Sequence, residues 1–443
     1  MSAVEEVAQP SVARRPRVGA WAVYRVELKK LRSQILARIA LGVCLLGPLV
    51  FIAIMKTQTT LPDDSLYGRW LHTSGFALPM VMLTFAGEVG FLVLIAVVAG
   101  DIFSSEDRYG TWDTVLIRPC RRGDVFVGKT LAAATYALAV LVLLTVSSIV
   151  SGLLLVGSQP MVDLSGRLVE GGSWLGLVLE SWATTIPPVL AFTCLGVLLS
   201  IATRSSIMGV LGTIVVGLLM ELLAVLGFRT LLLTTPFEAW HALLISPSDA
   251  WPFVQGTLVS IGYAAACLGG GWWLLRRRDF AGSAPASRQA NQNLRVRVGV
   301  VSVAAVVVLG AASFRPSPVT SASLQKSVTA TFLNLAQHKR EMIGRPVAIN
   351  GHVLPAGTSL RLTTTCTRGG QVGPGKGPGD DWTCLMALPG TLQPLFGYEV
   401  NAKANGCYTA DGATAIMGPL MIRVGNKTVV NPLLEFDGCI DTP

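Results

Sequence analysis

The chain has 443 residues, of which 51% are hydrophobic and 14% carry a charge, whereas about a quarter of the residues in soluble domains are charged. The apolar residues gather in runs of about 20, the length that crosses the hydrocarbon core of a membrane. A soluble protein is therefore excluded, and a polytopic membrane protein is indicated. The formal net charge is +9, but Lys and Arg cluster at the ends of the apolar runs, as the positive-inside rule describes. We therefore expect membrane lipid, and no nucleic acid, among its partners.

Two elements are predicted before the first membrane span. Residues 1–18 carry arginines among prolines and are expected to form a cytoplasmic tail. In residues 19–33, Trp21, Tyr24 and Leu28 recur at helical spacing while most cations occupy other positions. This pattern predicts an amphipathic helix that lies in the inner membrane interface. The alternative is that these residues begin the first span.

Seven apolar runs are long enough to span a membrane, and the cations between them give a consistent orientation. The N-terminus, the loop 101–129, Arg204 and residues 276–278 and 295–297 all fall on one side. By the positive-inside rule this side is the cytoplasm. The predicted spans are residues 35–55, 76–100, 130–156, 174–201, 207–228, 252–275 and, after a cytoplasmic linker over 279–297, 298–314.

Two stretches depart from a plain span or loop. Pro187 and Pro188 lie inside the fourth span and predict a bend there. Residues 229–251 are too apolar for a plain loop and too interrupted by Pro236 and Pro247 to cross the bilayer. They predict a re-entrant or interfacial hairpin on the outer face. An ordinary amphipathic loop is the alternative.

Residues 315–443 form an extracytoplasmic domain in this topology. A helical pattern over 323–340 precedes short segments separated by Gly and Pro, which predicts a small α+β domain made mostly of strands. It contains four cysteines, and an oxidising compartment favours disulfides. Four cysteines allow three pairings, and a zinc site is a rival whose usual C-x₂-C spacing is missing. We favour the pairs that close modest loops, Cys366–Cys384 and Cys407–Cys439.

The loop 101–129 has more internal pattern than a simple connection needs. Acidic residues including Glu106 begin it, and Arg118, Arg121 and Lys129 end it, as in a docking surface for a soluble partner. Residues 123–130 also satisfy G-x-x-x-x-G-K-[ST], the phosphate-binding P-loop pattern. A P-loop requires a preceding strand and a surrounding nucleotide domain, for which there is no room here. Lys129 is therefore interpreted as an anchor of the third span at the membrane interface.

Glu88 is the carboxylate placed most centrally in a span, while Glu180 and Glu221 lie nearer the outer ends of theirs. A charge inside a membrane is costly and usually functional. Glu88 could line a substrate path, accept a cationic compound or hold a proton. Equally, it could hydrogen-bond a neighbouring helix as a structural lock. We find no nucleophile–base constellation and no metal-ligand spacing, and so expect neither a catalytic nor a metal site.

The loop and its flanking spans resemble the ABC-2 type permeases, the membrane subunits of bacterial ATP-driven exporters of the type V class. The resemblance covers residues 19–278 and includes the interfacial helix, six spans and the outer hairpin. The seventh span and the outer domain depart from the family pattern. The residues that carry the resemblance are Ala99, Gly100, Asp101, Glu106, Gly110, Thr111, Leu116, Arg118, Pro119, Arg121, Gly128 and Lys129.

The resemblance implies a membrane all-α fold, in which a six-helix ABC-2 permease bundle with an N-terminal interfacial helix and an outer re-entrant hairpin is joined to a seventh span and a small extracytoplasmic domain. It implies a bacterial plasma-membrane permease that exports a hydrophobic or amphipathic compound such as an antibiotic or a lipid. The alternative is a non-transporting sensor or scaffold whose outer domain binds a ligand or an envelope protein.

The resemblance also implies a partner and a coupling site. The chain itself would be no enzyme and bind no cofactor, because ATP and Mg belong to a separate nucleotide-binding subunit. A second permease copy, expected to form a homodimer, would enclose a pathway near Glu88. The coupling helix that inserts into the ATPase subunit would use Glu106, Gly110, Thr111, Trp112, Leu116, Arg118, Pro119 and Arg121.

Overall fold

The computed structural model describes residues 19–58, 65–112, 114, 120–229, 231–278, 308, 317–349, 352–354, 362–370, 375–388, 394–424 and 427–440. The predicted tail (1–18), the linker (279–297) and all of the predicted seventh span except Val308 lie outside these residues. Those three assignments therefore stay predictions.

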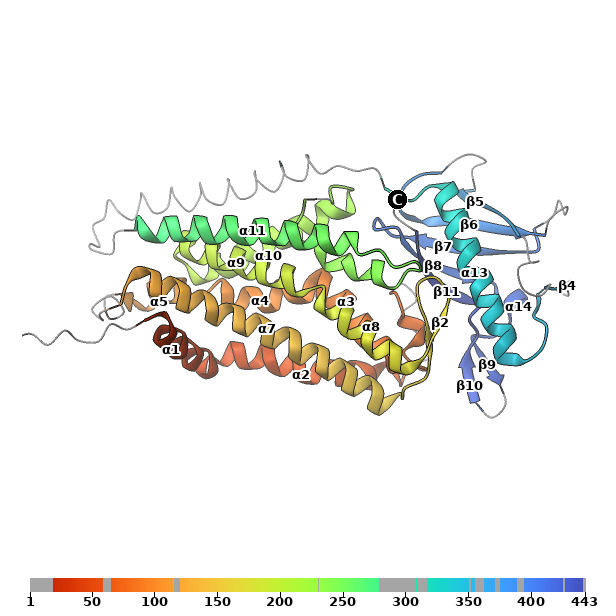
Figure 1. Ribbon diagram of the computed structural model, residues 1–443, viewed down its shortest axis with the longest axis horizontal. Helices are drawn as coiled ribbons and strands as arrows, with labels where there is room; N and C mark the ends of the chain where they lie inside the picture. Colours follow the sequence, from red (N-terminus) through yellow and green to blue (C-terminus); the bar gives the residue numbers. More distant parts are fainter. Residues whose placement is uncertain are drawn as a thin grey trace, which may run out of the picture.

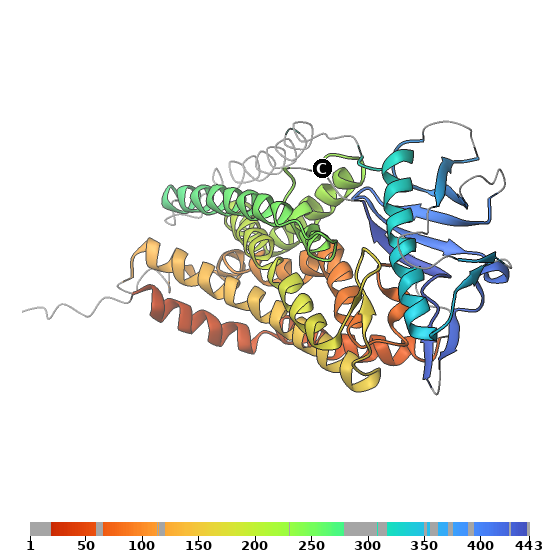
Figure 2. The same ribbon diagram turned by 45° about the vertical axis from the view of Figure 1, so that its right-hand side comes forward.

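Six helical segments of the described chain are long and apolar enough to cross a membrane. They run along the long axis of the molecule, with helix α1 (Ala20–Ser33) at one end and a β-rich domain at the other (Figures 1 and 2). We call these the α1 end and the domain end. The segments are α2 (Ile35–Met55), α3 to α4 (Ala77–Ala99), α7 (Arg122–Leu155), α8 to α9 (Gly171–Thr203), α10 (Ser206–Val225) and α11 (Trp251–Arg276).

Helix α1 is a separate helix, as its amphipathic pattern predicts. Gln34 between α1 and α2 is extended, with φ −71° and ψ 120°, which ends α1 before α2 begins. The alternative that these residues merely begin the first span is therefore wrong. Helix α1 packs along α7, where a Cβ at Gly128 would lie 2.7 Å from the Val23 side chain and 2.8 Å from the Ala20 carbonyl oxygen. Only glycine allows this close approach without displacing α1.

The second and fourth spans are each interrupted. A π-helical turn, η2 (Ala86–Gly90), joins α3 (Ala77–Phe85) to α4 (Phe91–Ala99), and such turns often mark functional sites. In the fourth span, α8 (Gly171–Ala183) ends at Thr184 and α9 (Ile186–Thr203) has prolines in its first turn. Proline lacks the N–H that a continuing helix needs. The predicted bend at Pro187 and Pro188 is thus confirmed, with the break just before the prolines.

Helix α7 begins at residue 122, whereas the sequence predicted the third span from residue 130. Asp124 accepts a hydrogen bond from the Arg121 N–H at 3.2 Å and so caps the first turn. Residues 123–130, which match the P-loop pattern, therefore belong to a continuous helix, and the loop that a phosphate site needs is not formed there. The loop 101–129 is correspondingly shorter, because α5 (Ser104–Tyr109) and α7 occupy parts of it.

The stretch between α10 and α11 contains a 3₁₀ helix, η3 (Thr235–Leu243). It packs against α11, α8 and the π turn η2. Its side chains Phe237 and Trp240 are each 1% exposed, so this is a packed element and not an ordinary surface loop. Its nine residues are too few to cross a bilayer; a re-entrant or interfacial hairpin on the outer face stays a prediction.

The β-rich domain, hereafter the β domain, is a five-stranded antiparallel sheet in the order β11-β8-β7-β6-β5. Helix α13 (Ser321–Ile343) covers one face of the sheet (Figure 2). The predicted α+β organisation is confirmed. The strands are β5 (Thr363–Arg368), β6 (Gly379–Ala387), β7 (Phe396–Ala402), β8 (Cys407–Gly412) and β11 (Glu435–Cys439).

Both predicted disulfides are confirmed. Cys366–Cys384 joins β5 to β6, and Cys407–Cys439 joins β8 to β11. Each pair lies directly opposite in the strand register. The smaller elements are η1 (Gly68–Trp70), β1 (Met161–Val162), β2 (Leu168–Val169), β3 (Ala348–Ile349), β4 (His352–Val353), α14 (Thr414–Met417), β9 (Met421–Val424) and β10 (Lys427–Val430).

Candidate functional site

At the α1 end, three buried side chains and the half-exposed Lys30 form a group that we call the α1-end ion cluster: Glu27 and Lys30 of α1, Glu106 of α5 and Lys129 of α7. The Lys129 Nζ lies 2.9 Å from Glu106 Oε1 and 3.1 Å from Glu27 Oε2, and it donates to the Ile102 carbonyl at 2.9 Å. Lys30 bridges the same acids at 2.6 and 3.0 Å. Lys129 is only 1% exposed, so its ammonium is enclosed by the cluster, and its predicted role as an anchor at the membrane interface stays a prediction.

The cluster keeps the Glu106 carboxylate charged. Burial alone would raise the pKa of Glu106, but Lys129, Lys30 and a hydrogen bond from the Thr111 hydroxyl lower it to about 2. Burial alone would lower the pKa of Lys30, but Glu27 and Glu106 outweigh burial and raise it. Two lysines thus balance two carboxylates, and buried charges that are paired in this way remain ionised. At neutral pH the cluster holds α1, α5 and α7 together.

A second set of contacts joins the same loop to the end of α11. Arg278 forms an ion pair with Asp107, and its guanidinium lies 5.0 Å from the centre of the Trp112 ring. The Arg122 Nη1 donates to the backbone carbonyls of Arg276 and Arg278 at 2.9 and 3.0 Å. The segment after the second span is therefore held from two sides, by α1 and by α11.

These contacts divide the predicted coupling residues into interior and surface positions. Glu106 and Trp112 are buried and hold the loop from within, and Thr111 donates its hydroxyl to Glu106. Gly110 ends α5 with φ +63°, a left-handed conformation that favours glycine. Gly110 and Arg121 are exposed. Leu116, Arg118 and Pro119 lie outside the described residues.

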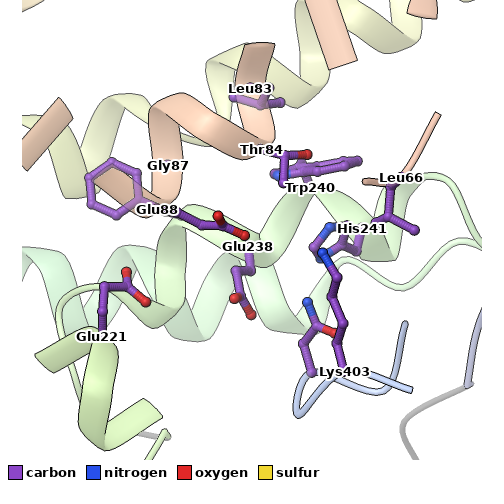
Figure 3. A pocket seen from close by; sticks show the side chains of 12 residues that line it. Leu66, Leu83, Thr84, Gly87, Glu88, Glu221, Glu238, Trp240, His241 and Lys403 are labelled. Carbon is purple, nitrogen blue, oxygen red and sulfur yellow. The ribbon is translucent and has the colours of Figure 1, made fainter. Parts of the chain in front are cut away.

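At the domain end, three carboxylates of the membrane part line one small cavity, which we call the carboxylate pocket (Figure 3). Glu88 comes from the π turn η2, Glu221 from near the end of α10 and Glu238 from η3. The cavity volume is about 20 Å³, enough for about one water molecule. Phe237 stacks on Phe91 with ring centres 5.7 Å apart, which fixes η3 against the second span.

The structural-lock interpretation of Glu88 has no hydrogen bond to support it. Within the described part of the chain, the Glu88 carboxylate makes neither a hydrogen bond nor an ion pair; Lys403 and Glu238 act on it only electrostatically. The side chain is exposed to the pocket rather than enclosed between helices. Glu88 therefore occupies a position from which it can meet a bound group.

The β domain completes the pocket. Lys403 and Asn405 lie in the turn between β7 and β8 and line the same cavity; Figure 3 shows how the Lys403 side chain extends toward it. The Lys403 N–H donates to the Cys407 carbonyl at 2.8 Å, and the Gly406 N–H donates to the Lys403 carbonyl at 3.0 Å. Gly406 has φ +85°, which favours glycine. Because the Cys407–Cys439 disulfide begins at the next residue, the turn is fixed to the sheet.

His241 of η3 is the neutral member of the pocket. Burial, together with Lys403 and Arg229 nearby, lowers the pKa of its ring to about 3, so the ring is uncharged at physiological pH. Its Nε2 has no hydrogen-bond partner in the described structure. Arg229 forms an ion pair with Glu238. The three carboxylates thus lie near two cations, Arg229 and Lys403.

One buried arginine docks the β domain on the bundle. Arg69 of η1 is 0% exposed and faces Asp411 and Glu435 at 3.4 Å and Asp437 at 3.6 Å. The Tyr67 N–H donates to Asp437 at 3.0 Å. Burial raises the pKa of the Asp437 carboxyl, and the Arg69 charge opposes this effect. The ion pairs fix the domain that carries Lys403 above the pocket.

Sequence reasoning found only part of this pocket. Glu88 and Glu221 were recognised as carboxylates inside spans, whereas Glu238, His241 and Lys403 were not singled out. The spacing of Glu238 and His241, three residues apart, places both on one face of a helix and was the only local signal. Lys403 belongs to another domain and gave none.

The fold defines a multi-pass helical membrane protein. The polar segment between its second and third spans is held to α1, α7 and α11 by ion pairs and hydrogen bonds. Residues 24–220 match the sequence model of the ABC-2 family transporter proteins. The match runs from helix α1 into helix α10. Proteins of the family are membrane permeases that work with separate ABC nucleotide-binding subunits and are not themselves catalytic. No curated protein matches the chain.

Proposed function

We propose that the chain is the permease subunit of an ATP-driven exporter that moves a hydrophobic or amphipathic compound outward. A separate nucleotide-binding subunit, with its ATP and Mg, supplies the energy. In this proposal the α1 end faces the bacterial cytoplasm, the β domain lies outside the cell, and a second copy of the chain completes a homodimer. The cations gathered at the α1 end, among them Arg276, Arg277 and Arg278, support the orientation through the positive-inside rule.

The observation that carries the proposal is the α1-end ion cluster. A partner that pushes on the exposed Gly110 and Arg121 acts on a segment whose Glu106 is bonded to both α1 and α7. Removing one member of a buried ion pair costs about 3 to 5 kcal/mol, so the cluster moves as one body. Movement of the loop is then passed to the interfacial helix and to the second and third spans. A simple connection between two helices needs no such bonding.

The proposal is tested by purifying the full chain from native membranes in mild detergent and identifying co-purifying proteins by mass spectrometry. The test variant is Gly110→Val combined with Arg118→Glu in the loop. The matched control is Gly344→Val combined with Arg345→Glu, which changes an exposed helix-ending glycine with φ +64° and its neighbouring arginine in the β domain. Wild type and control are expected to retain an ABC ATPase, and the loop variant to lose it.

If no ATPase is recovered even after crosslinking, the exporter loses its energy source. The non-transporting sensor or scaffold, whose outer domain binds a ligand or an envelope protein, then becomes the better function. Loss of the ATPase from both double variants would show that the loop is not the specific docking surface.

The carboxylate pocket is the candidate substrate contact. In vesicles that contain the chain and its ATPase, Glu88→Gln is expected to reduce transport of cationic compounds and to leave assembly with the ATPase intact. Transport at the wild-type rate would contradict a role for Glu88 in the path.

A further inference from the structure

The carboxylate pocket holds a cation of the protein's own. Figure 3 shows the carboxylates of Glu88 and Glu238 and the ammonium of Lys403 around a common space. Within the described chain, the Lys403 ammonium makes no ion pair or hydrogen bond, although its charge acts on Glu88 and His241. Lys403 is therefore attracted to the site without being bonded to it. A cation held in this way can be replaced by another.

A second feature of the pocket also indicates a ligand. His241 is 9% exposed, lines the cavity and has an Nε2 with no partner in the described structure. A buried polar atom without a hydrogen bond costs about 1 to 3 kcal/mol. Because the ring is neutral, an unpartnered ring nitrogen can accept a hydrogen bond from a protonated amine. His241 thus offers an acceptor beside the carboxylates.

A larger cavity continues from the pocket. It has a volume of about 780 Å³ and shares Glu238, His241 and Asn405 with the carboxylate pocket. Apolar side chains such as Pro236 and Ile245 line it. Binding sites for small molecules are cavities of about 300 to 1,000 Å³ with mostly apolar walls and a few converging polar groups. The two cavities together have this form, with the polar groups at one end.

We propose that the carboxylate pocket binds the ammonium group of an amphipathic amine, between Glu88, Glu221 and Glu238 and beside His241, while the apolar body of the amine occupies the adjoining cavity. In the present structure the Lys403 ammonium takes the place of that group. The β domain thereby acts as an internal competitor, whose Lys403 side chain leaves the pocket when an amine enters. The proposal rests on the proposed export function and names its substrate class.

The turn that carries Lys403 is built to keep the competitor in place. The Cys407–Cys439 disulfide holds the base of the turn to the sheet, and Arg69 holds the sheet to the bundle. Removing the Lys403 charge also changes the electrostatics of the pocket. With Lys403 present, three carboxylates face two cations; without it, they face Arg229 alone, and the attraction for an external cation increases.

The test measures binding to the purified full-length chain in detergent, without an ATPase. The probes are 1-naphthylmethylamine, protonated at pH 7, and its uncharged analogue 1-naphthylmethanol, followed by calorimetry. Wild type is expected to bind the amine at least about tenfold more tightly than the alcohol, a difference of about 1.4 kcal/mol. Glu88→Gln combined with Glu221→Gln is expected to remove this preference.

The Lys403→Met variant gives the sharper result, because it is expected to bind the amine about three- to tenfold more tightly than wild type does. An unfolded or distorted site cannot gain affinity in this way. The matched controls are Lys376→Met and Glu170→Gln, exposed residues of the same charge outside the pocket. Both are expected to bind as wild type does, and thermal melting checks that every variant is folded.

Equal affinity for amine and alcohol, or an amine preference that survives the double Gln substitution, overturns the amine site. Weaker amine binding by Lys403→Met overturns the role of Lys403 as a competitor. These outcomes are distinct from failure of the export function. If no ATPase partner exists, the binding preference still holds; if transport occurs without the preference, only this inference fails.

Discussion

The two ends of the bundle both bury charge, but they do so in opposite ways. At the α1 end, Lys30 and Lys129 balance Glu27 and Glu106 through direct contacts of 2.6 to 3.1 Å. At the domain end, three carboxylates share a cavity with Lys403, which bonds to none of them in the described structure. The first arrangement is complete without a ligand, whereas the second is not.

The difference separates a mechanical element from a binding element. Direct and balanced ion pairs resist separation, and so they transmit movement between the helices that carry them. A pocket with carboxylates and an unpartnered acceptor carries the free-energy cost of desolvating these polar groups until a ligand supplies the missing contacts. Both ends bury charged side chains, so burial alone does not distinguish them. The direct ion pairs do, because they are present in the α1-end ion cluster and Lys403 forms none in the described structure.

The largest effect is expected when the balance at the α1 end is broken. Lys129→Met leaves Glu27 and Glu106 buried with only the half-exposed Lys30 between them. Loss of one member of a buried ion pair costs about 3 to 5 kcal/mol. We expect a pronounced fall in melting temperature in detergent and loss of the co-purifying ATPase.

The control for this variant restores the balance by another route. Lys129→Met combined with Glu106→Gln removes one charge of each sign, and its melting temperature is expected to recover part of the loss. If the double variant is as unstable as the sum of the two single variants, the two side chains act independently and the cluster is not a unit.

Most of the fold followed from sequence, because membrane spans are specified by local properties. The first span was predicted as residues 35–55 and is observed as Ile35–Met55. The third was placed eight residues late, at 130 rather than 122, because Arg122, Asp124 and Lys129 look like loop residues by polarity. Their charges are satisfied by a cap, by backbone carbonyls and by the ion cluster, none of which hydrophobicity can reveal.

The sites were less predictable, because each is assembled from distant parts of the chain. Glu106 meets Lys30 across 76 positions of sequence, and Tyr67 meets Asp437 across 370. Glu88 could be chosen from its place in a span, since an intramembrane carboxylate is unusual. Lys403 lies in a surface turn, where lysine is ordinary, and only the docking of the β domain brings it to the pocket.

A smaller effect is expected at the interface between the bundle and the β domain. Arg69→Met removes the guanidinium that lies 3.4 to 3.6 Å from Asp411, Glu435 and Asp437. Because Asp411 and Glu435 are partly exposed, the loss should lie between the ~1 kcal/mol of an exposed pair and the ~3 kcal/mol of a buried one. Hydrogen–deuterium exchange should rise at the β7–β8 turn and stay unchanged at α1. Equal protection at the turn would show that other contacts dock the domain.

The smallest effect concerns pH, and it also distinguishes the two ends. Burial lowers the pKa of His241 from 6.5 to about 3, so the unfolded chain binds a proton at this ring before the folded chain does, and stability falls as pH drops below about 6.5. At pH 5.5 this loss is on the order of 1 kcal/mol.

The pKa of Glu106 is lowered from 4.5 to about 2, so its contribution is present above pH 4.5 and is lost only as pH falls from there toward 2. Between pH 7 and 5.5, the melting temperature of wild type should therefore fall relative to that of His241→Gln, and Glu106→Gln should leave the wild-type slope unchanged. His338, whose pKa burial also lowers, adds a decline that all three proteins share. If Glu106→Gln flattens the slope in this window and His241→Gln does not, the acid-sensitive charge lies at the α1 end and the contrast between the two ends is wrong.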